Sequence, residues 1–257
     1  MTTSVKVCEL KRRPAPVPSH LASYHGRVRI ILLLTLCFRI GLAQQRSFTV
    51  EADALWITPV GSLGDRFLPA LGGTVALGIV TKSSPTWSIG AEYFLFEREN
   101  SSKFVLTRRV QDGGTVREVQ LPLPLLSMKL ESFALTGNAG YRLLGTSFVE
   151  ANATVGLGIY YWRSYRGAYY DTLEVQTITG PVIGEILHEP EVNERDWAGG
   201  FEVGANVRMK IIRPIWFNIG VRMKMVVGEL ESSLPLELEK VSTFKMVGAR
   251  IGLHAIF

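Results

Sequence analysis

Hydrophobic and polar residues alternate along most of this chain after residue 46. In the last stretch, residues 246–257, every second residue counted back from Phe257 is apolar, and glycines, Arg250 and His254 lie between. Alternation with a period of two predicts a β-strand with one apolar and one polar face. The pattern recurs eight times, without a sustained helical period. The predicted strands are 48–57, 71–80, 86–96, 132–143, 148–162, 197–211, 215–226 and 246–257.

The connections between these strands alternate strictly between short and long. The short ones are 81–85, 144–147 and a turn at Arg213-Pro214. The long ones are roughly 58–70, 97–131, 163–196 and 227–242. This alternation, with an even number of strands, is typical of a membrane barrel with tight periplasmic turns and long external loops. We therefore predict an all-β fold, an eight-stranded antiparallel up-and-down transmembrane β-barrel.

A soluble barrel also alternates, but it turns its apolar face inward. Here the polar faces carry long charged side chains interleaved with glycines, which fits the narrow interior of an eight-stranded barrel better than a solvated surface. An unpaired buried charge is costly, so opposite charges in that interior should pair. The pattern predicts a salt-bridged, plugged lumen. The predicted lumen charge network is Glu51, Asp53, Glu92, Arg142, Glu150, Glu202, Arg208, Arg222, Lys224 and Arg250.

The apolar faces carry aromatic residues near both ends of the strands. Two such girdles are expected where a membrane barrel meets the two lipid–water interfaces. The uncharged apolar face of the last strand covers eleven positions, 247–257, which matches the roughly 9–11 residues that a tilted strand needs to cross hydrocarbon. The predicted girdle residues are Trp56, Trp87, Tyr141, Tyr161, Trp197 and Phe217.

The first 43 residues differ in composition from the rest. They hold seven Lys or Arg and one acid, so the net charge of +5 for the whole chain becomes about −1 for residues 44–257. The high pI therefore gives no reason to expect a nucleic-acid partner. Both cysteines, Cys8 and Cys37, lie in this leader, so the barrel domain does not depend on disulfides.

The leader has the features of a secretory signal peptide. Arg27 and Arg29 precede an apolar run at 30–38, and Gly41 and Ala43 are small residues in front of a cleavage site. The run is too short to span a bilayer as a helix, which needs about 20 residues. We expect a leader over 1–43, cleaved near Ala43, a barrel domain over 44–257, and a location in the bacterial outer membrane.

The export signal, the eight alternating strands and the terminal phenylalanine resemble small bacterial outer-membrane barrels of the OmpA-transmembrane and OmpX type. The layout is most similar to the PorT-like outer-membrane barrel family. The resemblance implies that the last strand, with Ile251, Leu253 and Phe257, is an assembly signal read by the barrel-insertion machinery. Ala255 departs from that pattern, which often has an aromatic residue there. A PorT-like role would be accessory to protein secretion.

Residues suited to catalysis are scarce in the barrel domain. Its two histidines, His188 and His254, are far apart in sequence and belong to no recognisable Ser/His/acid arrangement. His188 with Glu185, Glu189 and Glu191 could hold a cation, but a solvated acidic loop is the stronger interpretation. We predict no enzyme, no cofactor and no metal site.

The long connections are the expected carriers of function, because external loops on a rigid scaffold usually are. Residues 104–121 read as a hairpin with its turn at Asp112-Gly113-Gly114, and residues 173–187 as a second hairpin with its turn near Gly180-Pro181. We expect outer-membrane lipid around the barrel and a binding, structural or secretion-accessory role through the loops, with a possible protein partner. The alternatives are a small passive pore and, less favoured, a lipid-modifying enzyme.

Overall fold

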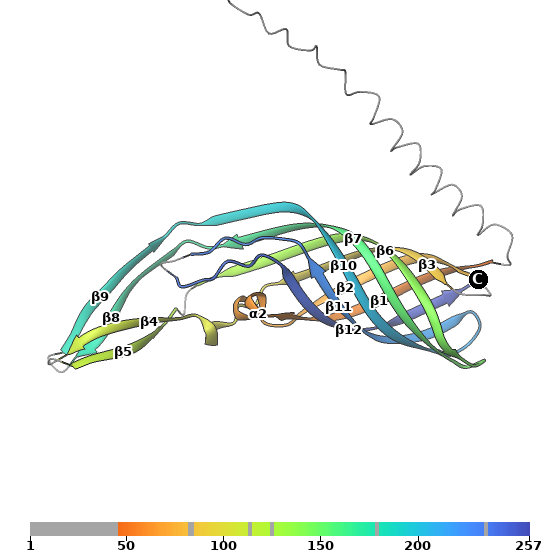
Figure 1. Ribbon diagram of the computed structural model, residues 1–257, viewed down its shortest axis with the longest axis horizontal. Coiled ribbons are helices and arrows are strands. Elements are labelled where there is room, and N and C mark those ends of the chain that lie inside the picture. The colour runs from red at the N-terminus through yellow and green to blue at the C-terminus, as the bar shows by residue number, and fades with distance from the viewer. Residues whose placement is uncertain (1–45, 82–84, 113–114, 124–125, 178–179, 234–235) are drawn as a thin grey trace, which may run out of the picture. The chain divides into compact units, whose positions relative to one another are not determined.

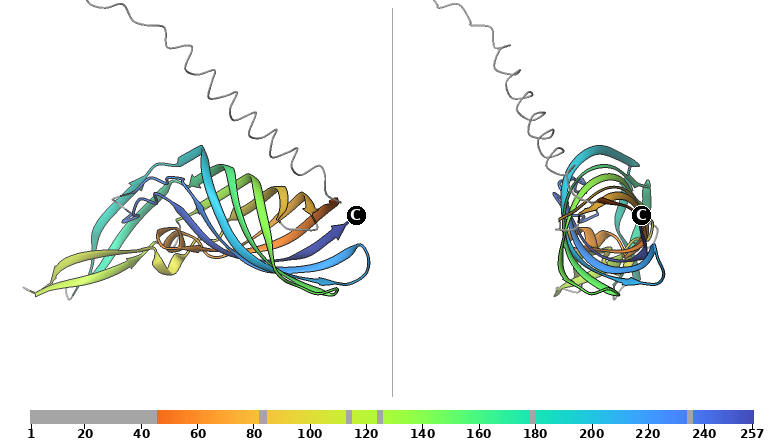
Figure 2. Two further views of the ribbon diagram at one scale, coloured as in Figure 1. Left: turned by 45° about the vertical axis from the view of Figure 1, so that its right-hand side comes forward. Right: turned by 90° about the vertical axis from the view of Figure 1, so that its right-hand side faces the viewer.

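Eight antiparallel strands close into a barrel in a computed structural model of the protein (Figure 1). Their order around the barrel is β1-β12-β11-β10-β7-β6-β3-β2, so that every strand pairs with its chain neighbours among the eight and β1 pairs with β12. The right-hand view of Figure 2 looks along the barrel and shows the ring that they form. The strands are β1 (Arg46–Val60), β2 (Ala70–Thr81), β3 (Thr86–Phe96), β6 (Met128–Gly145), β7 (Val149–Arg166), β10 (Val192–Lys210), β11 (Ile215–Val226) and β12 (Phe244–Ile256).

The structure describes residues 46–81, 85–112, 115–123, 126–177, 180–233 and 236–257. The predicted leader and its cleavage site lie outside the described residues. No helix in the part of the chain that the structure describes is long and apolar enough to cross a membrane.

The predicted eight-stranded antiparallel barrel is confirmed. The predicted strands 86–96 and 215–226 coincide with β3 and β11. The largest difference is at β10, which begins at Val192 rather than at residue 197. There β7 and β10 continue to pair beyond the aromatic positions, with Arg163 opposite Arg195. This extension is polar on both faces, so the alternation that marks a membrane-crossing strand stops before the strand itself ends.

Two hairpins project beyond the barrel at the end that carries the long connections (Figure 1). β4 (Val105–Asp112) pairs with β5 (Thr115–Pro122), and β8 (Tyr169–Thr177) pairs with β9 (Gly180–Glu189). Both predicted hairpins are present. The second is longer than predicted, and Gly180 and Pro181 lie in β9 rather than at its turn. Residues 113 and 114 of the first predicted turn lie outside the described residues. By the rule that the long loops of such barrels are external, this end faces the cell exterior. A short helix, α2 (Ser62–Arg66), and a 3-10 turn, η2 (Ser101–Lys103), lie in the first and second long connections.

The apolar face of each strand lies on the outside of the barrel. Ile89 and Leu157 are each 73% exposed, whereas Glu51 and Asp53 on the polar face are buried. A soluble barrel would bury such apolar side chains, since removing apolar surface from water is the main favourable term in folding. The soluble alternative is therefore wrong, and the wall is built to face lipid.

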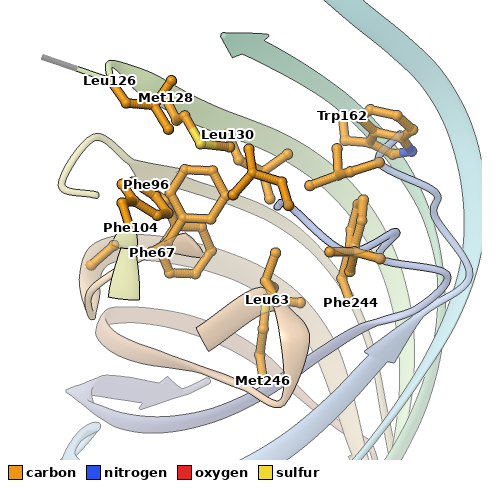
Figure 3. Packing of buried hydrophobic residues seen from close by; sticks show 14 of the residues in the cluster. Leu63, Phe67, Phe96, Phe104, Leu126, Met128, Leu130, Trp162, Phe244 and Met246 are labelled. Carbon is orange, nitrogen blue, oxygen red and sulfur yellow. The ribbon is translucent and has the colours of Figure 1, made fainter. Parts of the chain in front are cut away.

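The inward positions change character along the barrel. In the half with the short turns they are polar, but at the external end they form an apolar core that the alternation pattern did not predict. Phe94 and Phe96 pack edge to face at 5.5 Å, Phe67 lies 5.7 Å from Phe96, and Trp162 packs edge to face on Phe244 at 5.4 Å (Figure 3). The mouth core, as we call this cluster, includes Leu55, Ile57, Leu63, Phe67, Phe94, Phe96, Phe104, Leu130, Trp162, Phe244 and Met246.

The sequence does contain an indication of the mouth core, namely the unbroken apolar runs 55–57, 93–96 and 160–162. Continuous apolar runs mark strands that are buried on both faces. Here the outward residues of each run face lipid and the inward residues pack in the mouth core.

Candidate functional site

Glu51 is the centre of a charged cluster in the half of the lumen nearer the short turns. Its carboxylate lies 3.0 Å from the Arg208 guanidinium and 2.8 Å from that of Arg250, and 3.2 Å from Nδ1 of His254. Neighbouring Asp53 lies 3.4 Å from Arg250. These groups come from β1, β10 and β12, so that the cluster ties together strands from across the barrel.

Asn218 of β11 completes this cluster. Its side-chain amide donates to Glu51 Oε1 at 3.2 Å and to Asp53 Oδ1 at 3.0 Å, and its oxygen accepts from Asn206 at 3.1 Å. A buried carboxylate is tolerated only when it is paired and hydrogen-bonded. The cluster meets that condition with two carboxylates, two guanidinium groups and these amides.

A second charged cluster lies between β3, β10 and β11. Arg222 Nη1 is 3.0 Å from Glu92 Oε2 and 3.2 Å from Glu202 Oε2. Lys224 pairs with Glu92 and lies 3.2 Å from Glu202. The side chains of Glu92 and Lys224 are 1% and 2% exposed, so this ion pair is deeply buried in the barrel. Two acids and two bases make the cluster neutral.

The remaining two residues of the predicted network, Arg142 and Glu150, pair with each other beside the first cluster, and Glu150 lies directly opposite Arg208 across the β7–β10 pairing. They pair at 3.3 Å near the β6–β7 turn, where the Arg142 side chain is 47% exposed. An exposed pair of this kind contributes about 0–1 kcal/mol to stability. The network is thus two buried clusters and one partly exposed ion pair next to the first of them.

Glycines make room for side chains inside the bore. Gly200 of β10 lies opposite Gly158 of β7, and the Tyr160 ring lies across both. A Cβ atom built on Gly200 would come within 2.7 Å of Tyr160 Cε2 and 2.8 Å of the Met225 carbonyl oxygen. The glycines on the polar face therefore serve packing in the lumen, as their spacing among charged residues suggested.

Gly200→Ala should lower the free energy of unfolding by about 1–3 kcal/mol, because overpacking forces a shift of Tyr160 or of the backbone. Gly199→Ala is the matched control, since its Cβ would meet nothing within 4 Å. The control should change stability by less than about 0.5 kcal/mol. Urea unfolding of the two refolded variants in detergent micelles compares them, and equal losses would contradict the packing role.

The last long connection folds over the external mouth. We call residues 227–233 and 236–243 the cap loop. Its side chains Leu230, Leu236, Leu238 and Val241 are buried in the mouth core. Backbone hydrogen bonds in both directions join Leu230 to Val241, at 2.8 and 3.1 Å. The cap loop is therefore a folded lid with its own apolar underside.

Contacts from the other long connections converge on the cap loop. Arg66 of α2, 5% exposed, donates through Nη2 to the carbonyl oxygens of Glu231 at 2.8 Å and Glu239 at 2.6 Å. Burial lowers the pKa of Arg66 to about 10, so it is still cationic at neutral pH. The Glu231 amide donates at 3.3 Å to the carboxylate of Glu194, which lies in the polar extension of β10. Burial raises the pKa of Glu194.

The two hairpins also reach the cap loop. Ser233 Oγ donates to Glu189 of β9 at 3.1 Å, and Arg166 of β7 lies 3.4 Å from the same carboxylate. Glu237 pairs with Arg108 of β4. The two hairpins belong to the second and third long connections. Both hairpins contact the cap loop: Arg108 of β4 pairs with Glu237, and Glu189 of β9 accepts a hydrogen bond from Ser233.

The predicted girdle residues all lie on the outer face of the barrel. Trp56, Trp87 and Trp197 are 49%, 59% and 65% exposed. At the external end one aromatic row runs across four neighbouring strands, in which the rings of Tyr161 and Trp197 are 5.2 Å apart. The row is Tyr93, Phe133, Tyr161 and Trp197, each directly opposite the next. Contact with the lipid interface remains a prediction for these residues.

The predicted assembly residues lie where the barrel closes. Ile251, Leu253 and Phe257 are 50%, 51% and 67% exposed on the outer face. The amides of Phe48 and Phe257 each donate to the other's carbonyl, at 3.2 and 2.9 Å. The last strand thus forms half of the closing seam. Its recognition by the insertion machinery is a further step that stays a prediction.

The histidines are far apart in the fold. His254 is buried beside Glu51, whereas His188 of β9 is exposed and its ring lies 4.5 Å from the ring of Tyr170. Among the residues that the structure describes, no group of three His, Cys, Asp or Glu side chains could hold a metal ion.

An eight-stranded closed wall with a lipid-compatible outer face and a charged interior defines a class of protein. The chain is an integral β-barrel protein of the bacterial outer membrane. The sequence matches no protein-family model and no curated protein.

Solved structures of small outer-membrane barrels are similar to this chain in fold. Neisserial surface protein A is 12% identical, with 83% of this chain and all of that chain covered, at a TM-score of 0.47. A major outer membrane protein from Thermus thermophilus has the same identity and coverage at a TM-score of 0.48. The N-terminal β-barrel domain of Pseudomonas aeruginosa OprF is 12% identical over 82% of this chain and 99% of that chain, at 0.35. All three scores are below 0.5, so the class of this protein rests on its own geometry.

Proposed function

We propose that this protein is a non-conducting surface barrel that acts by binding through its external hairpins and cap loop, without enzymatic chemistry. The observation that supports the proposal is the presence of buried side chains at two levels inside the barrel. Two clusters of paired acids and bases lie in the lumen, and the mouth core with the cap loop lies above them. An eight-stranded barrel has an interior just wide enough for side chains, so these groups leave little room for solutes.

The hairpins β4–β5 and β8–β9 supply the binding surface in this proposal. Each is a two-stranded sheet beyond the barrel, and unpaired strand edges are ready partners for another chain. Val116, Tyr170 and Ile186 on these hairpins are 66%, 62% and 72% exposed, which adds apolar contact area. The secretion-accessory role implied by the PorT-like resemblance is one specific form of this function and stays a prediction.

Planar-bilayer recording of the refolded chain 44–257 tests the closed lumen. We expect no steady conductance steps, because charge pairs and the mouth core both obstruct the bore. Steady single-channel steps in the wild type would contradict the proposal and favour the small passive pore.

A cross-linked pull-down from outer membranes tests the binding role, with a tag placed after Gln44. The matched control is the same barrel with 105–122 replaced by a short Gly-Ser turn, which should lose any partner held through β4–β5. Recovery of the same proteins with and without the hairpin would argue against a binding role for it.

A further inference from the structure

Glu237 of the cap loop adopts a backbone conformation that its residue type rarely takes. Its φ is +51°, and among the described residues it is the only non-glycine residue with positive φ. Leu236 and Leu238 on either side are buried in the mouth core, and two backbone hydrogen bonds of 2.9 and 3.0 Å join Ser233 to Leu238. Left-handed backbone is strained for a residue with a Cβ and persists only where surroundings impose it. Here the buried leucines impose it.

This strained backbone points the Glu237 side chain at the hairpin β4–β5. Its carboxylate accepts a hydrogen bond from the Thr107 amide at 3.2 Å and pairs with the Arg108 guanidinium. Thr107 and Arg108 are consecutive residues of β4, so a backbone N–H and a guanidinium converge on one anionic group. This pair of donors suits carboxylate, phosphate and sulfate oxygens alike.

The site is reachable from outside. The side chains of Arg108 and Glu237 are 30% and 38% exposed. Arg109, whose side chain is 78% exposed, follows on the same strand and pairs with Glu118 at 3.0 Å. An exposed ion pair contributes little net stability. The contact between cap loop and hairpin is therefore exchangeable.

We propose that the Thr107 amide and the Arg108 guanidinium form an anion-binding site, that Glu237 is its internal occupant, and that a phosphate or sulfate group of an external partner displaces Glu237. A phosphate monoester has more charge than one carboxylate, and phosphate and sulfate esters alike present several acceptor oxygens, so such a group competes with the tethered side chain. Displacement separates the cap loop from β4–β5, while Arg66 and the buried leucines still hold the rest of the lid. The inference rests on the proposed binding role of the hairpins and adds the chemistry of the partner.

Binding of inorganic phosphate and of a fully sulfated disaccharide to the refolded chain 44–257 tests the site by calorimetry. Glu237→Gln removes the internal competitor, so it should tighten binding about tenfold. Arg108→Gln should weaken binding at least about tenfold. Glu118→Gln is the matched control, because it removes one acid from the exposed Arg109 pair without opening the site. It should stay within about twofold of wild type.

Hydrogen exchange provides a second measurement on the same samples. Saturating disaccharide should speed exchange of the Glu237 amide in wild type, leave Leu230 and Val241 protected, and protect the Thr107 amide. Glu237→Gln should show the faster exchange at residue 237 without ligand. Phosphatidylcholine vesicles with and without phosphatidylglycerol distinguish a lipid phosphate from a soluble glycan as the source.

Equal tightening by Glu237→Gln and Glu118→Gln would overturn the inference, since net charge alone would explain it. Failure of every probe to bind Glu237→Gln would also overturn it. Either result leaves the pull-down with the shortened hairpin as a separate test of the proposed function.

Discussion

Glu92→Gln should lower the free energy of unfolding by about 3–5 kcal/mol, which is the usual effect of removing one partner from a buried ion pair. The change leaves Arg222 and Lys224 facing the single carboxylate of Glu202, with an uncompensated charge where the Lys224 side chain is 2% exposed. Lys224→Met should cost a similar amount, because Glu92 and Glu202 then share one guanidinium. Equilibrium unfolding in urea with detergent micelles measures both.

The double variant Glu92→Gln/Lys224→Met tests whether charge balance is the cause. It retains one acid and one base, so most of the loss should be recovered, to within about 2 kcal/mol of wild type. Arg109→Gln is the control, since it breaks the ion pair with Glu118, whose side chains are 78% and 59% exposed, and should change stability by about 0–1 kcal/mol. Single variants within about 1 kcal/mol of wild type would mean that the lumen is hydrated, and the closed-bore proposal would lose its main support.

Phe96→Ala should also lower the free energy of unfolding by about 3–5 kcal/mol, as large-to-small changes of buried phenylalanine do. Phe96 has no exposed surface and packs on Phe67 and Phe94. The cavity removes support from α2 and the cap loop, so amide exchange in 62–67 and 236–241 should accelerate.

Phe133→Ala is the matched control for Phe96→Ala. Phe133 lies on the outer face, is 44% exposed and would contact lipid, whose chains can fill the space that its ring leaves. Its replacement should cost much less and should leave exchange in the cap loop unchanged. Equal effects of the two changes would argue against a mouth core that holds the lid.

Glu92→Gln and Phe96→Ala change two different levels of the same bore. The charge clusters hold strands together across the lumen, and the mouth core holds the lid above them. Loss of either should lower stability, whereas steady conductance in bilayer recordings should require the loss of both, because the proposed closed bore has a barrier at each level. Binding through the hairpins requires neither barrier, whereas a non-conducting barrel requires at least one of them.

Local pattern was enough to predict the barrel. The alternation of apolar and polar residues and the alternating lengths of the connections depend only on neighbours in sequence, and they indicated eight strands, their order and the outer face. The strand prediction failed where the alternation of apolar and polar residues stopped. The polar extension of β10 before residue 197 was missed, and so was the apolar character of the inward residues at the external ends of β1, β3 and β7, because period-two alternation assumes one wet and one dry face.

The number of strands, their pairing order and the residues that point inward follow from the amino-acid sequence alone, because side-chain direction in a strand has a period of two. Which inward residues meet is a property of the closed fold. Glu51 reaches Arg208 over 157 positions of the chain, and Lys224 reaches Glu92 over 132. Those pairs depend on the stagger between strands around the barrel, and no local pattern contains it. The same holds for Glu237 and Arg108, where two long connections meet only because the barrel brings their ends together.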